Sequence, residues 1–197
     1  GVFPTANIDR PDRSAANGVA HFRRLVTHSE PVMVTTRETA GDELVVQQIA
    51  KLDFAYFAGG EPPYVVEALS ETPVWTALLA AWRAGMGIGG SSAGAMVMCD
   101  SMYLREAWTP GLGLLRGVVV LPHFNRRDAA SAERARAAVT AEGYLGLGID
   151  ESTAVVWTLG GGWVAAGRGV VSVLAADGAR RYEDGDAVEA VPAPGRP

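Results

Sequence analysis

The stretch GIGGSSAGAMVM, residues 87–98, decides the fold of this chain. Its first residues form a short apolar segment of the kind that makes a buried strand, and the residues after the first serine can start a helix directly. Glycines on both sides of the serines let the backbone turn more sharply than larger side chains would allow. The stretch therefore predicts a strand, a tight turn and a helix in immediate succession.

The segments on either side of this turn alternate in the same way. Apolar and β-branched runs predict strands, and apolar residues at helical spacing predict helices. We expect strands within 1–5, 31–36 and 54–60, a helix that begins at Ser14 with this serine as its cap, a helix within 41–52, and two helices within 62–85 that divide near Thr72 and Pro73. Alternating strands and helices predict an α/β fold, a three-layer sandwich with a mostly parallel central sheet.

The chain changes character from Thr153 onward. Residues 153–159, 162–167 and 170–176 are rich in β-formers and are separated by glycine-containing turns, so they predict hairpins that close the sheet edge. No repeat or linker divides the 197 residues, which predicts one domain over 1–197 with a loose tail at 191–197. Because the chain opens on Gly1 and not on Met, a trimmed amino terminus with a missing first strand is a further hypothesis.

The composition is typical of a soluble globular protein. Hydrophobic residues make up 48% of the chain, charged residues make up 20%, and the formal net charge is -5. The 17 Lys and Arg residues are spread along the chain, which argues against a nucleic-acid partner. No apolar run reaches the roughly 18 residues of a membrane span, so we expect a cytoplasmic protein without a membrane partner. The single cysteine, Cys99, has no partner for a disulfide or a zinc site, and we expect neither metal nor cofactor.

Gly90, Ser91, Ser92, Ala93 and Gly94 match G-x-S-x-G, the pattern of a nucleophile elbow between a strand and a helix. In such a turn the central Ser92 hydroxyl stands clear of the sheet, and the N–H groups at the helix start lie where negative charge develops during attack on a carbonyl. The alternative is a close crossing of helix and sheet that needs small residues, and Ser91 is the alternative nucleophile. A phosphate-binding loop is disfavoured, because neither G-x-G-x-x-G nor G-K-[ST] fits this stretch.

A serine nucleophile needs a base, and histidine is the usual one near neutral pH. His21 lies in a predicted amphipathic helix, and His28 lies in a polar loop before a predicted strand. His123 directly follows a buried apolar strand, at the end where parallel sheets gather their active-site groups. We prefer His123, with a packed histidine that caps this strand as the alternative.

The third member of a triad is a carboxylate that orients the imidazole. Asp150 and Glu151 follow another small apolar strand, and because neighbouring side chains point opposite ways, only one of them can face inward. Asp100 and Glu106 are further candidates, although Asp100 lies eight residues beyond Ser92, about two turns along the predicted helix. The residues alone leave the choice between Asp150 and Glu151 open.

These motifs resemble those of a family of serine peptidases that includes dipeptidase E and cyanophycinase, within the class I glutamine amidotransferase-like fold. The resemblance rests on VFPTA, YFAGGEP, GGSSAGAMV, GLGLL, HFNRR and GIDESTAVV, which stand in the family's order over about residues 2–175. It implies that Ser92 is the nucleophile, His123 the base and Glu151 the acid. It also implies an oxyanion hole made by the backbone N–H groups of Gly60 and Ala93.

The residues that would choose the substrate follow this family less closely. Glu61 stands where dipeptidase E has asparagine, and Leu121 and Pro122 stand where cyanophycinase has Asp and Gln. Arg127 matches a family arginine that holds a substrate carboxylate, and Arg126 precedes it. Glu61, Arg126 and Arg127 are therefore our candidate substrate-binding residues, and the substrate itself stays open.

Arg134 and Arg136 on the next predicted helix are weaker candidates for substrate binding. The alternative for all these arginines is a solvated helix start, in which they pair with acidic neighbours such as Glu133.

Three functions fit these residues. The first is a serine exopeptidase of dipeptidase E type, which hydrolyses small peptides through an acyl-enzyme; a homodimeric assembly is a further hypothesis. The second is a cyanophycinase-like peptidase or an amidase that acts on a non-peptide amide. The third is a non-catalytic, ligand-binding member of the fold, in which Ser92 survives only as a tight turn.

Overall fold

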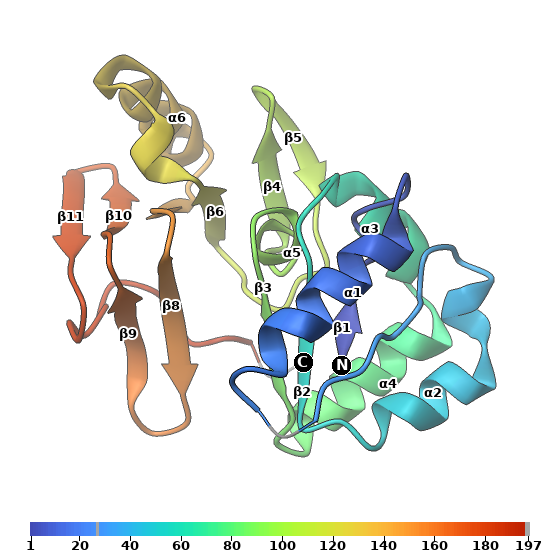
Figure 1. Cartoon of the computed structure of the whole chain (residues 1–197). Helices are drawn as coiled ribbons and strands as arrows, with labels where there is room; N and C mark the ends of the chain where they lie inside the picture. Colours follow the sequence, from blue (N-terminus) through green and yellow to red (C-terminus); the bar gives the residue numbers. More distant parts are fainter. Residues whose placement is uncertain (27, 196–197) are drawn as a thin grey trace. The chain divides into compact units, whose positions relative to one another are not determined.

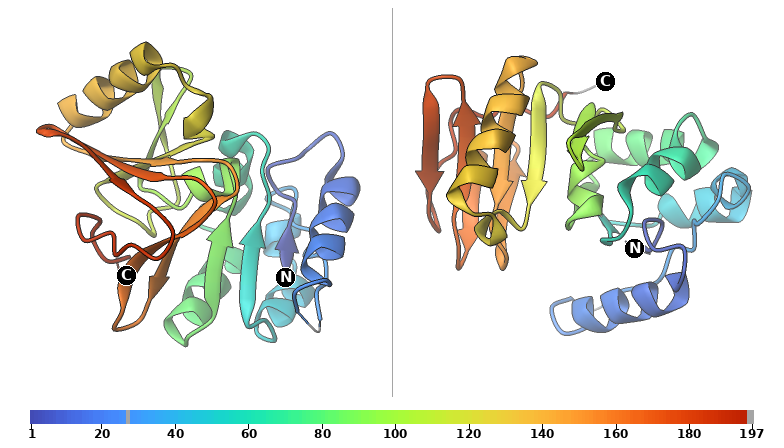
Figure 2. Two further views of the ribbon diagram at one scale, coloured as in Figure 1. Left: turned by 60° about the vertical axis from the view of Figure 1, so that its left-hand side comes forward. Right: turned by 90° about the horizontal axis from the view of Figure 1, so that it is seen from above.

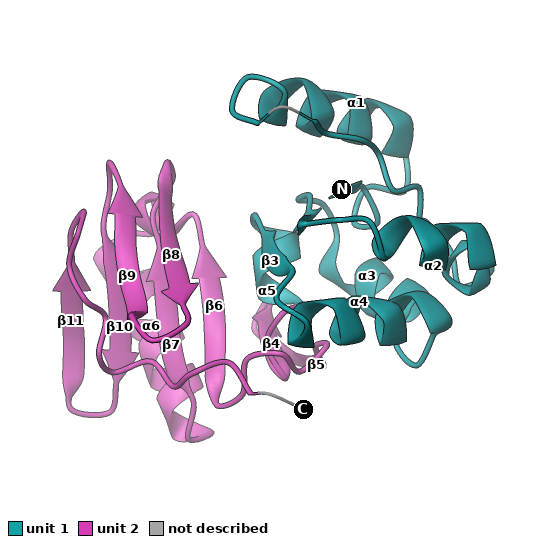
Figure 3. Cartoon of the chain, turned by 90° about the horizontal axis from the view of Figure 1, so that it is seen from below, with its two compact units in different colours: residues 1–97 teal, residues 98–197 magenta. Residues whose placement is uncertain are grey.

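The computed structural model describes residues 1–26 and 28–195 (Figure 1). The chain divides into two compact units, Gly1–Val97 (unit 1) and Met98–Pro197 (unit 2), which Figure 3 colours separately. Each unit contains a sheet and its own set of buried apolar side chains.

Unit 1 is built on a parallel sheet of three strands in the order β1-β2-β3. Its elements in chain order are β1 (Val2–Phe3), α1 (Pro11–Phe22), the 3-10 turn η1 (Thr39–Gly41), α2 (Glu43–Ile49), β2 (Phe54–Phe57), α3 (Pro62–Leu69), α4 (Pro73–Arg83), β3 (Gly87–Gly90) and α5 (Ala93–Met96). Because the strands run the same way, the segments that follow β2 and β3 leave the sheet at the same edge.

Different helices cover the two faces of this sheet. Val2 and Tyr56 are partners in register, and the ring of Tyr56 meets Phe22 of α1 with centroids 4.8 Å apart. Phe3 and Phe57 are the next pair, and because side chains alternate along a strand they point to the other face, where their rings stack 4.7 Å apart. Figures 2 and 3 show α1 on one side of these strands, with α2 and α4 on the other.

Prolines and a threonine set the helix starts. α3 begins at Pro62 and α4 at Pro73, since the first helical position tolerates a residue without an N–H. The Thr72 side chain accepts a hydrogen bond from a backbone N–H of the first turn of α4, so the predicted division near Thr72 and Pro73 is confirmed. α1 begins at Pro11, three residues before Ser14, and the prediction that Ser14 caps it is wrong because the proline starts the helix earlier.

Residues 31–36, expected as a strand, form only one isolated bridge, between Pro31 and Val2. The backbone does run beside β1, since the N–H of Val32 donates to the oxygen of Val2 over 2.9 Å. It then turns away, and the N–H of Val34 donates back to the oxygen of Val32. The apolar pattern of this segment reflects burial, because Val32 and Val34 are fully buried, but it does not reflect ladder pairing.

The helix after the serine turn is shorter than its sequence predicts. α5 ends at Met96, so the expected continuation through Cys99 and Asp100 is wrong. Beyond α5 the backbone forms hydrogen bonds with a segment farther along the chain. Cys99 forms a β-bridge with Leu115, and the N–H of Asp100 donates to the oxygen of Leu115 over 2.9 Å. These long-range bonds replace the helical ones, which sequence periodicity cannot reveal.

Unit 2 contains a mixed sheet of four strands in the order β11-β10-β7-β6 and two separate hairpins, β4-β5 and β8-β9. Its elements are β4 (Ser101–Leu104), β5 (Ala107–Pro110), β6 (Val118–Pro122), the 3-10 turn η2 (Phe124–Arg126), α6 (Ala129–Ala141), β7 (Leu145–Ile149), β8 (Thr153–Thr158), β9 (Gly162–Gly167), β10 (Val171–Ala175) and β11 (Gly178–Tyr182). The expected C-terminal hairpins are present as β8-β9 and β10-β11.

The expectation of a mostly parallel sheet holds for β1 to β3 and for β6 with β7, and it fails for the rest of the chain. β7 pairs antiparallel with β10, and β10 pairs antiparallel with β11. A parallel return needs a crossover connection, usually a helix, and after β7 the chain continues in hairpins instead.

Helix α6 covers one face of the four-stranded sheet (Figure 2). A buried apolar cluster joins them: Ala135 and Val139 of α6, Val119 and Leu121 of β6, and Leu174 of β10. The helix starts where the Asp128 carboxylate accepts a hydrogen bond from the N–H of Ser131 over 2.7 Å.

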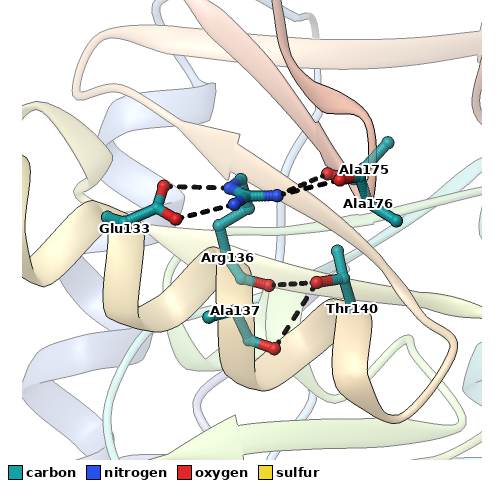
Figure 4. A network of polar contacts seen from close by, with 6 residues as sticks. All are labelled: Glu133, Arg136, Ala137, Thr140, Ala175 and Ala176. Atoms are coloured by element: carbon teal, nitrogen blue, oxygen red, sulfur yellow. Dashed lines mark hydrogen bonds and ion pairs between the residues drawn. The ribbon is translucent and has the colours of Figure 1, made fainter.

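Arg136 ties α6 to the turn between β10 and β11 (Figure 4). Its Nε and Nη2 donate to the two oxygens of Glu133 over 2.9 and 2.6 Å, and its Nη1 donates to the carbonyls of Ala175 and Ala176 over 3.0 and 3.3 Å. The pairing with Glu133 that the sequence left as the alternative is the one that Arg136 makes.

Residues 191–195 form no helix or strand, but two hydrogen bonds attach them. The oxygen of Pro192 accepts from Trp163 Nε1 over 2.8 Å, and the N–H of Gly195 donates to the oxygen of Leu114 over 3.1 Å. Residues 196–197 of the predicted tail lie outside the described residues. No helix within 1–26 and 28–195 combines the length and the apolar character that crossing a membrane requires.

Candidate active site

Ser92 lies in the turn between β3 and α5 with φ 51° and ψ -115°, a conformation that favours glycine. The flanking glycines make this turn possible. A Cβ on Gly90 would lie 2.5 Å from the carbonyl carbon of Gly94, and a Cβ on Gly94 would collide with the oxygen of Phe57. The backbones of β2, β3 and α5 thus approach so closely that no larger residue fits at either position.

The segment after β2 lies beside this turn, within the same unit. A Cβ on Gly59 would lie 3.3 Å from the Cβ of Ser92 and 3.9 Å from its Oγ. Gly60 has φ 152°, and a Cβ there would collide with the carbonyl oxygen of Ala6, which also accepts a hydrogen bond from the N–H of Glu61 over 2.8 Å. Gly59 therefore lies against the serine, and the backbone of Gly60, the next residue, is held against Ala6.

Ala93 is the first residue of α5, and the N–H of a first helical residue has no acceptor inside its own helix. The helix itself has only four residues, so the N–H groups of its first turn, and not a long helix dipole, are what this turn offers to a negative charge. Ser91 is also held by its backbone, since its N–H donates to the oxygen of Phe57 over 3.1 Å.

In unit 2, His123 directly follows β6 and adopts the left-handed conformation, with φ 52° and ψ 40°. Its Nδ1 lies 3.1 Å from Oε1 of Glu151, which follows β7 closely along the chain. β6 and β7 are parallel neighbours, so residues that follow their carboxyl ends meet at one edge of the sheet. Both side chains are partly exposed, His123 at 48% and Glu151 at 36%.

The turn η2 holds Glu151 at two further points. Oδ1 of Asn125 accepts a hydrogen bond from the backbone N–H of Glu151 over 3.1 Å. Nη2 of Arg126 lies 2.8 Å from Oε1 of Glu151, the same oxygen that faces His123. Sequence reasoning missed both contacts, and its only indication was that the two residues follow His123 within the motif HFNRR.

The comparison with known families decides where this chain belongs. The model of peptidase family S51 matches residues 3–161, which is more than half of the chain. The chain belongs to peptidase family S51. The resemblance to the serine peptidases that include dipeptidase E and cyanophycinase is thereby confirmed.

Curated relatives of this S51 chain include cyanophycinases. That of Synechococcus elongatus is 29% identical over 188 residues, which cover 88% of this chain and 58% of the relative. That of Nostoc sp. (strain PCC 7120) is 30% identical over 154 residues, which cover 72% of this chain and 51% of the relative. The chain thus spans between half and three fifths of the length of these relatives.

Two solved structures have the same fold as the S51 chain. A peptidase from an acI-B1 Actinobacterium superposes with a TM-score of 0.80 at 28% identity, covering 94% of this chain and 80% of the other. A putative peptidase E protein from Listeria monocytogenes EGD-e superposes with a TM-score of 0.60 at 18% identity, covering 85% of each chain. The second likeness concerns the fold alone.

Within the S51 chain, Asp150 and Glu151 point to different partners, as their adjacency requires. Oδ2 of Asp150 accepts a hydrogen bond from the N–H of Val170 over 3.0 Å, which holds the segment before β10. Glu151 is the one that meets His123. The structure therefore shows which of the two carboxylates faces the imidazole, a choice that the residues alone left open.

The other candidates for base and acid lie elsewhere. His21, on α1, contacts Arg24 just beyond the end of that helix, and His28 pairs with Glu30 over 3.2 Å with 77% of its side chain exposed. Glu106 lies in the turn between β4 and β5 with φ 65°. Asp100 has a buried Oδ1 without a hydrogen-bond partner in the part of the chain that the structure describes.

The candidate substrate-binding residues lie close in the chain to candidate catalytic or oxyanion-hole residues of their own unit. Glu61 follows Gly60 and precedes α3, and Arg127 is an exposed residue at the end of η2. Arg134 donates to the Ser131 hydroxyl over 2.9 Å, a contact within α6. Arg126 differs from its neighbour Arg127 because its guanidinium is paired with Glu151.

Cys99 is fully buried, and burial raises the pKa of its thiol to about 12. A thiol with so high a pKa stays protonated near neutral pH and is a poor nucleophile. Among residues 1–26 and 28–195, no group of three or more His, Cys, Asp or Glu side chains could hold a metal ion.

Proposed function

We propose that this S51 chain is a serine peptidase that hydrolyses small peptides, with Ser92 as the nucleophile, His123 as the base and Glu151 as the acid. The observation that carries the proposal is the contact between Nδ1 of His123 and Oε1 of Glu151. With Nδ1 turned to a carboxylate, Nε2 is the ring nitrogen that accepts a proton from a serine hydroxyl. Glu151 then stabilises the imidazolium that forms.

The proposed reaction proceeds through an acyl-enzyme. The hydroxyl oxygen of Ser92 attacks the amide carbon while its proton passes to His123, which returns that proton to the leaving amine as the C–N bond breaks. The N–H groups of Gly60 and Ala93 stabilise the negative oxygen of the tetrahedral intermediate. Water, activated by the same imidazole, then hydrolyses the ester. We retain the three-layer sandwich and the nucleophile elbow that the sequence predicts as parts of this proposal.

Glu61 and Arg127 are proposed to bind the charged ends of a peptide. Arg127 is proposed to hold a substrate carboxylate, because a guanidinium offers a fork of donors that fits one. Glu61, next to the oxyanion donor Gly60, is proposed to face the substrate amine. Both assignments favour a short peptide with free termini, as in a dipeptidase of dipeptidase E type.

A cyanophycinase-like activity is the second candidate, favoured by the curated relatives, which are cyanophycinases. Against it, Leu121 and Pro122 precede His123 where cyanophycinase has Asp and Gln. A non-peptide amide as the substrate, and a non-catalytic ligand-binding role, are the remaining alternatives.

One experiment separates these functions. A library of dipeptides with α-linked and β-linked aspartyl members, together with the branched Asp-Arg polymer, is offered to the wild type and to Ser92→Ala. We expect turnover of dipeptides and a loss of several orders of magnitude in Ser92→Ala. Ser91→Ala, a change in the neighbouring hydroxyl, is the matched control and keeps most of the activity. Full activity of folded Ser92→Ala rules out the proposed nucleophile, and cleavage of the polymer in preference to dipeptides favours the second candidate.

A fluorophosphonate probe tests the non-catalytic alternative directly. Labelling of the wild type that disappears in Ser92→Ala supports a serine enzyme. Folded wild type that takes no label and cleaves nothing in the library favours the non-catalytic, ligand-binding alternative.

A further inference from the structure

An imidazole and a guanidinium share one carboxylate oxygen of Glu151. Oε1 of Glu151 lies 3.1 Å from Nδ1 of His123 and 2.8 Å from Nη2 of Arg126. All three residues belong to unit 2, so their geometry is defined within one compact unit. The shorter of the two contacts is the one to the arginine.

A single contact to an imidazole holds a glutamate poorly. Glu151 is 36% exposed and has a side chain of three rotatable bonds, so it loses much rotamer freedom when it is fixed in one geometry. A second charged donor on the same oxygen restricts these rotamers further, and hydrogen bonds to ionised groups are stronger than neutral ones. Arg126 is such a donor, and its charge does not depend on pH in the working range.

The turn η2 brings the donor and the imidazole together. His123 begins this turn in the left-handed conformation, and the N–H of Arg126 donates to the oxygen of His123 over 3.0 Å, which closes it. Asn125 of the same turn accepts the backbone N–H of Glu151. The turn η2 therefore contacts both the backbone and the carboxylate of Glu151, and the imidazole of His123 at its start contacts the same carboxylate.

From this geometry we propose that Arg126 is a positioning residue, which holds the Glu151 carboxylate on Nδ1 of His123, and not a substrate-binding residue. The proposal rests on the proposed function insofar as it concerns catalysis. The Arg126 guanidinium, although 69% exposed, is paired with a carboxylate of the protein itself. Arg127, the next residue, is also exposed and follows the turn.

The kinetic test separates the two roles of Arg126. In Arg126→Ala we expect kcat to fall about 5- to 20-fold with KM within twofold, because the substrate is bound as before while the imidazole is oriented less well. Arg126→Lys recovers part of kcat, since a single contact to one oxygen needs only one charged donor. Arg180→Ala, which removes a surface ion pair to Asp177 in the β10-β11 turn, is the matched control and changes neither constant by more than twofold.

A double-mutant comparison supplies the sharper readout. If Arg126 acts through Glu151, Arg126→Ala has less than a twofold effect in a Glu151→Ala background. A KM that rises with kcat unchanged, or a loss of the same size in the Glu151→Ala background, overturns the proposal in favour of direct contact with substrate.

A structural arm distinguishes failure of this proposal from failure of the proposed function. Crystal structures of the wild type and of Arg126→Ala need no activity. We expect the contact between Glu151 Oε1 and His123 Nδ1 in the wild type and its loss in the variant. If the contact persists unchanged in Arg126→Ala, the positioning role is wrong, whether or not the protein cleaves peptides. If Ser92→Ala is active, the proposed function is wrong, but the two crystal structures still decide the role of Arg126.

Discussion

Ser92 carries a conformational cost in the turn between β3 and α5. Its φ of 51° and ψ of -115° suit glycine, yet a serine stands there, between glycines that are required by close backbone approach. A non-glycine residue with positive φ costs about 1–2 kcal/mol. Strain of this kind persists at sites where the side chain is needed.

Replacing Ser92 by glycine and by alanine separates strain from chemistry. Both variants lose the hydroxyl and hence the proposed activity, but only glycine relieves the backbone. We expect Ser92→Gly to unfold at a Tm about 2–4 °C higher than Ser92→Ala, from a stabilisation of about 1 kcal/mol in a chain of this size. Thermal unfolding followed by circular dichroism measures the difference, and equal Tm values for the two variants contradict the strain.

Cys99 is a residue of a reactive type that burial in the fold makes unreactive. Its thiol is fully buried with a pKa raised to about 12, so we expect no reaction with a thiol reagent in the native protein at pH 8. The same reagent titrates one thiol per chain once the protein is unfolded. Rapid native labelling, or inhibition by iodoacetamide of an activity that depends on Ser92, would show that this expectation is wrong.

For the secondary-structure elements of this chain, prolines and capping residues predict the bounds of helices better than long hydrophobic patterns do. The prolines at 62 and 73 and the cap at Thr72 place α3 and α4 correctly. The apolar run at 31–36 and the helical pattern after Ser92 mislead, because the partners of their backbone groups lie far away in the chain. A periodicity describes which side chains are buried, and it leaves open where the backbone bonds go.

Helix α6 offers a test of electrostatics at this scale. The hydrogen bonds from Arg136 lower the pKa of Glu133 below its ordinary value of 4.5. A lowered pKa means that the pair stabilises the folded state above pH 4.5 and that this contribution is lost as the pH falls through the folded-state value. We expect Glu133→Gln to lower Tm by about 1 °C at pH 7, and to lower it less and less below pH 4.5.

Arg136→Ala is the companion variant. It also removes the bonds to the carbonyls of Ala175 and Ala176, which do not titrate, so its Tm stays below that of the wild type at every pH. A Tm difference for Glu133→Gln that grows in acid contradicts a lowered pKa of Glu133 in the folded state.

At the scale of the whole molecule, the proposed triad has its members in two compact units. Ser92, Gly60 and Ala93 belong to unit 1, and His123, Glu151 and Arg126 belong to unit 2. The family model spans both, from residue 3 to residue 161. The single domain, the homodimer and the cytoplasmic location stay predictions of the sequence.

Labelling of Ser92 tests whether His123 is its base. We expect His123→Ala to slow fluorophosphonate labelling of Ser92 by about 100-fold or more, because the hydroxyl loses its base although its own unit is unchanged. His21→Ala and His28→Ala are the controls, since these imidazoles contact Arg24 and Glu30, and they label at the wild-type rate. Mass spectrometry of the labelled peptide gives the labelling rates. A His123→Ala variant that is labelled at the wild-type rate excludes His123 as the base.

The sequence by itself determined the local geometry and the chemistry of the candidate groups. The strand, tight turn and helix start around Ser92 follow from glycines and small residues that are neighbours in the chain, and the motifs that point to family S51 are equally local. Tertiary structure alone decided that Glu151 and not Asp150 faces His123, that Arg126 contacts the same oxygen of Glu151, and that the four-stranded sheet is mixed. The reason is that a turn depends on backbone conformations of adjacent residues, whereas a pairing between residues 28 positions apart depends on which strands lie side by side.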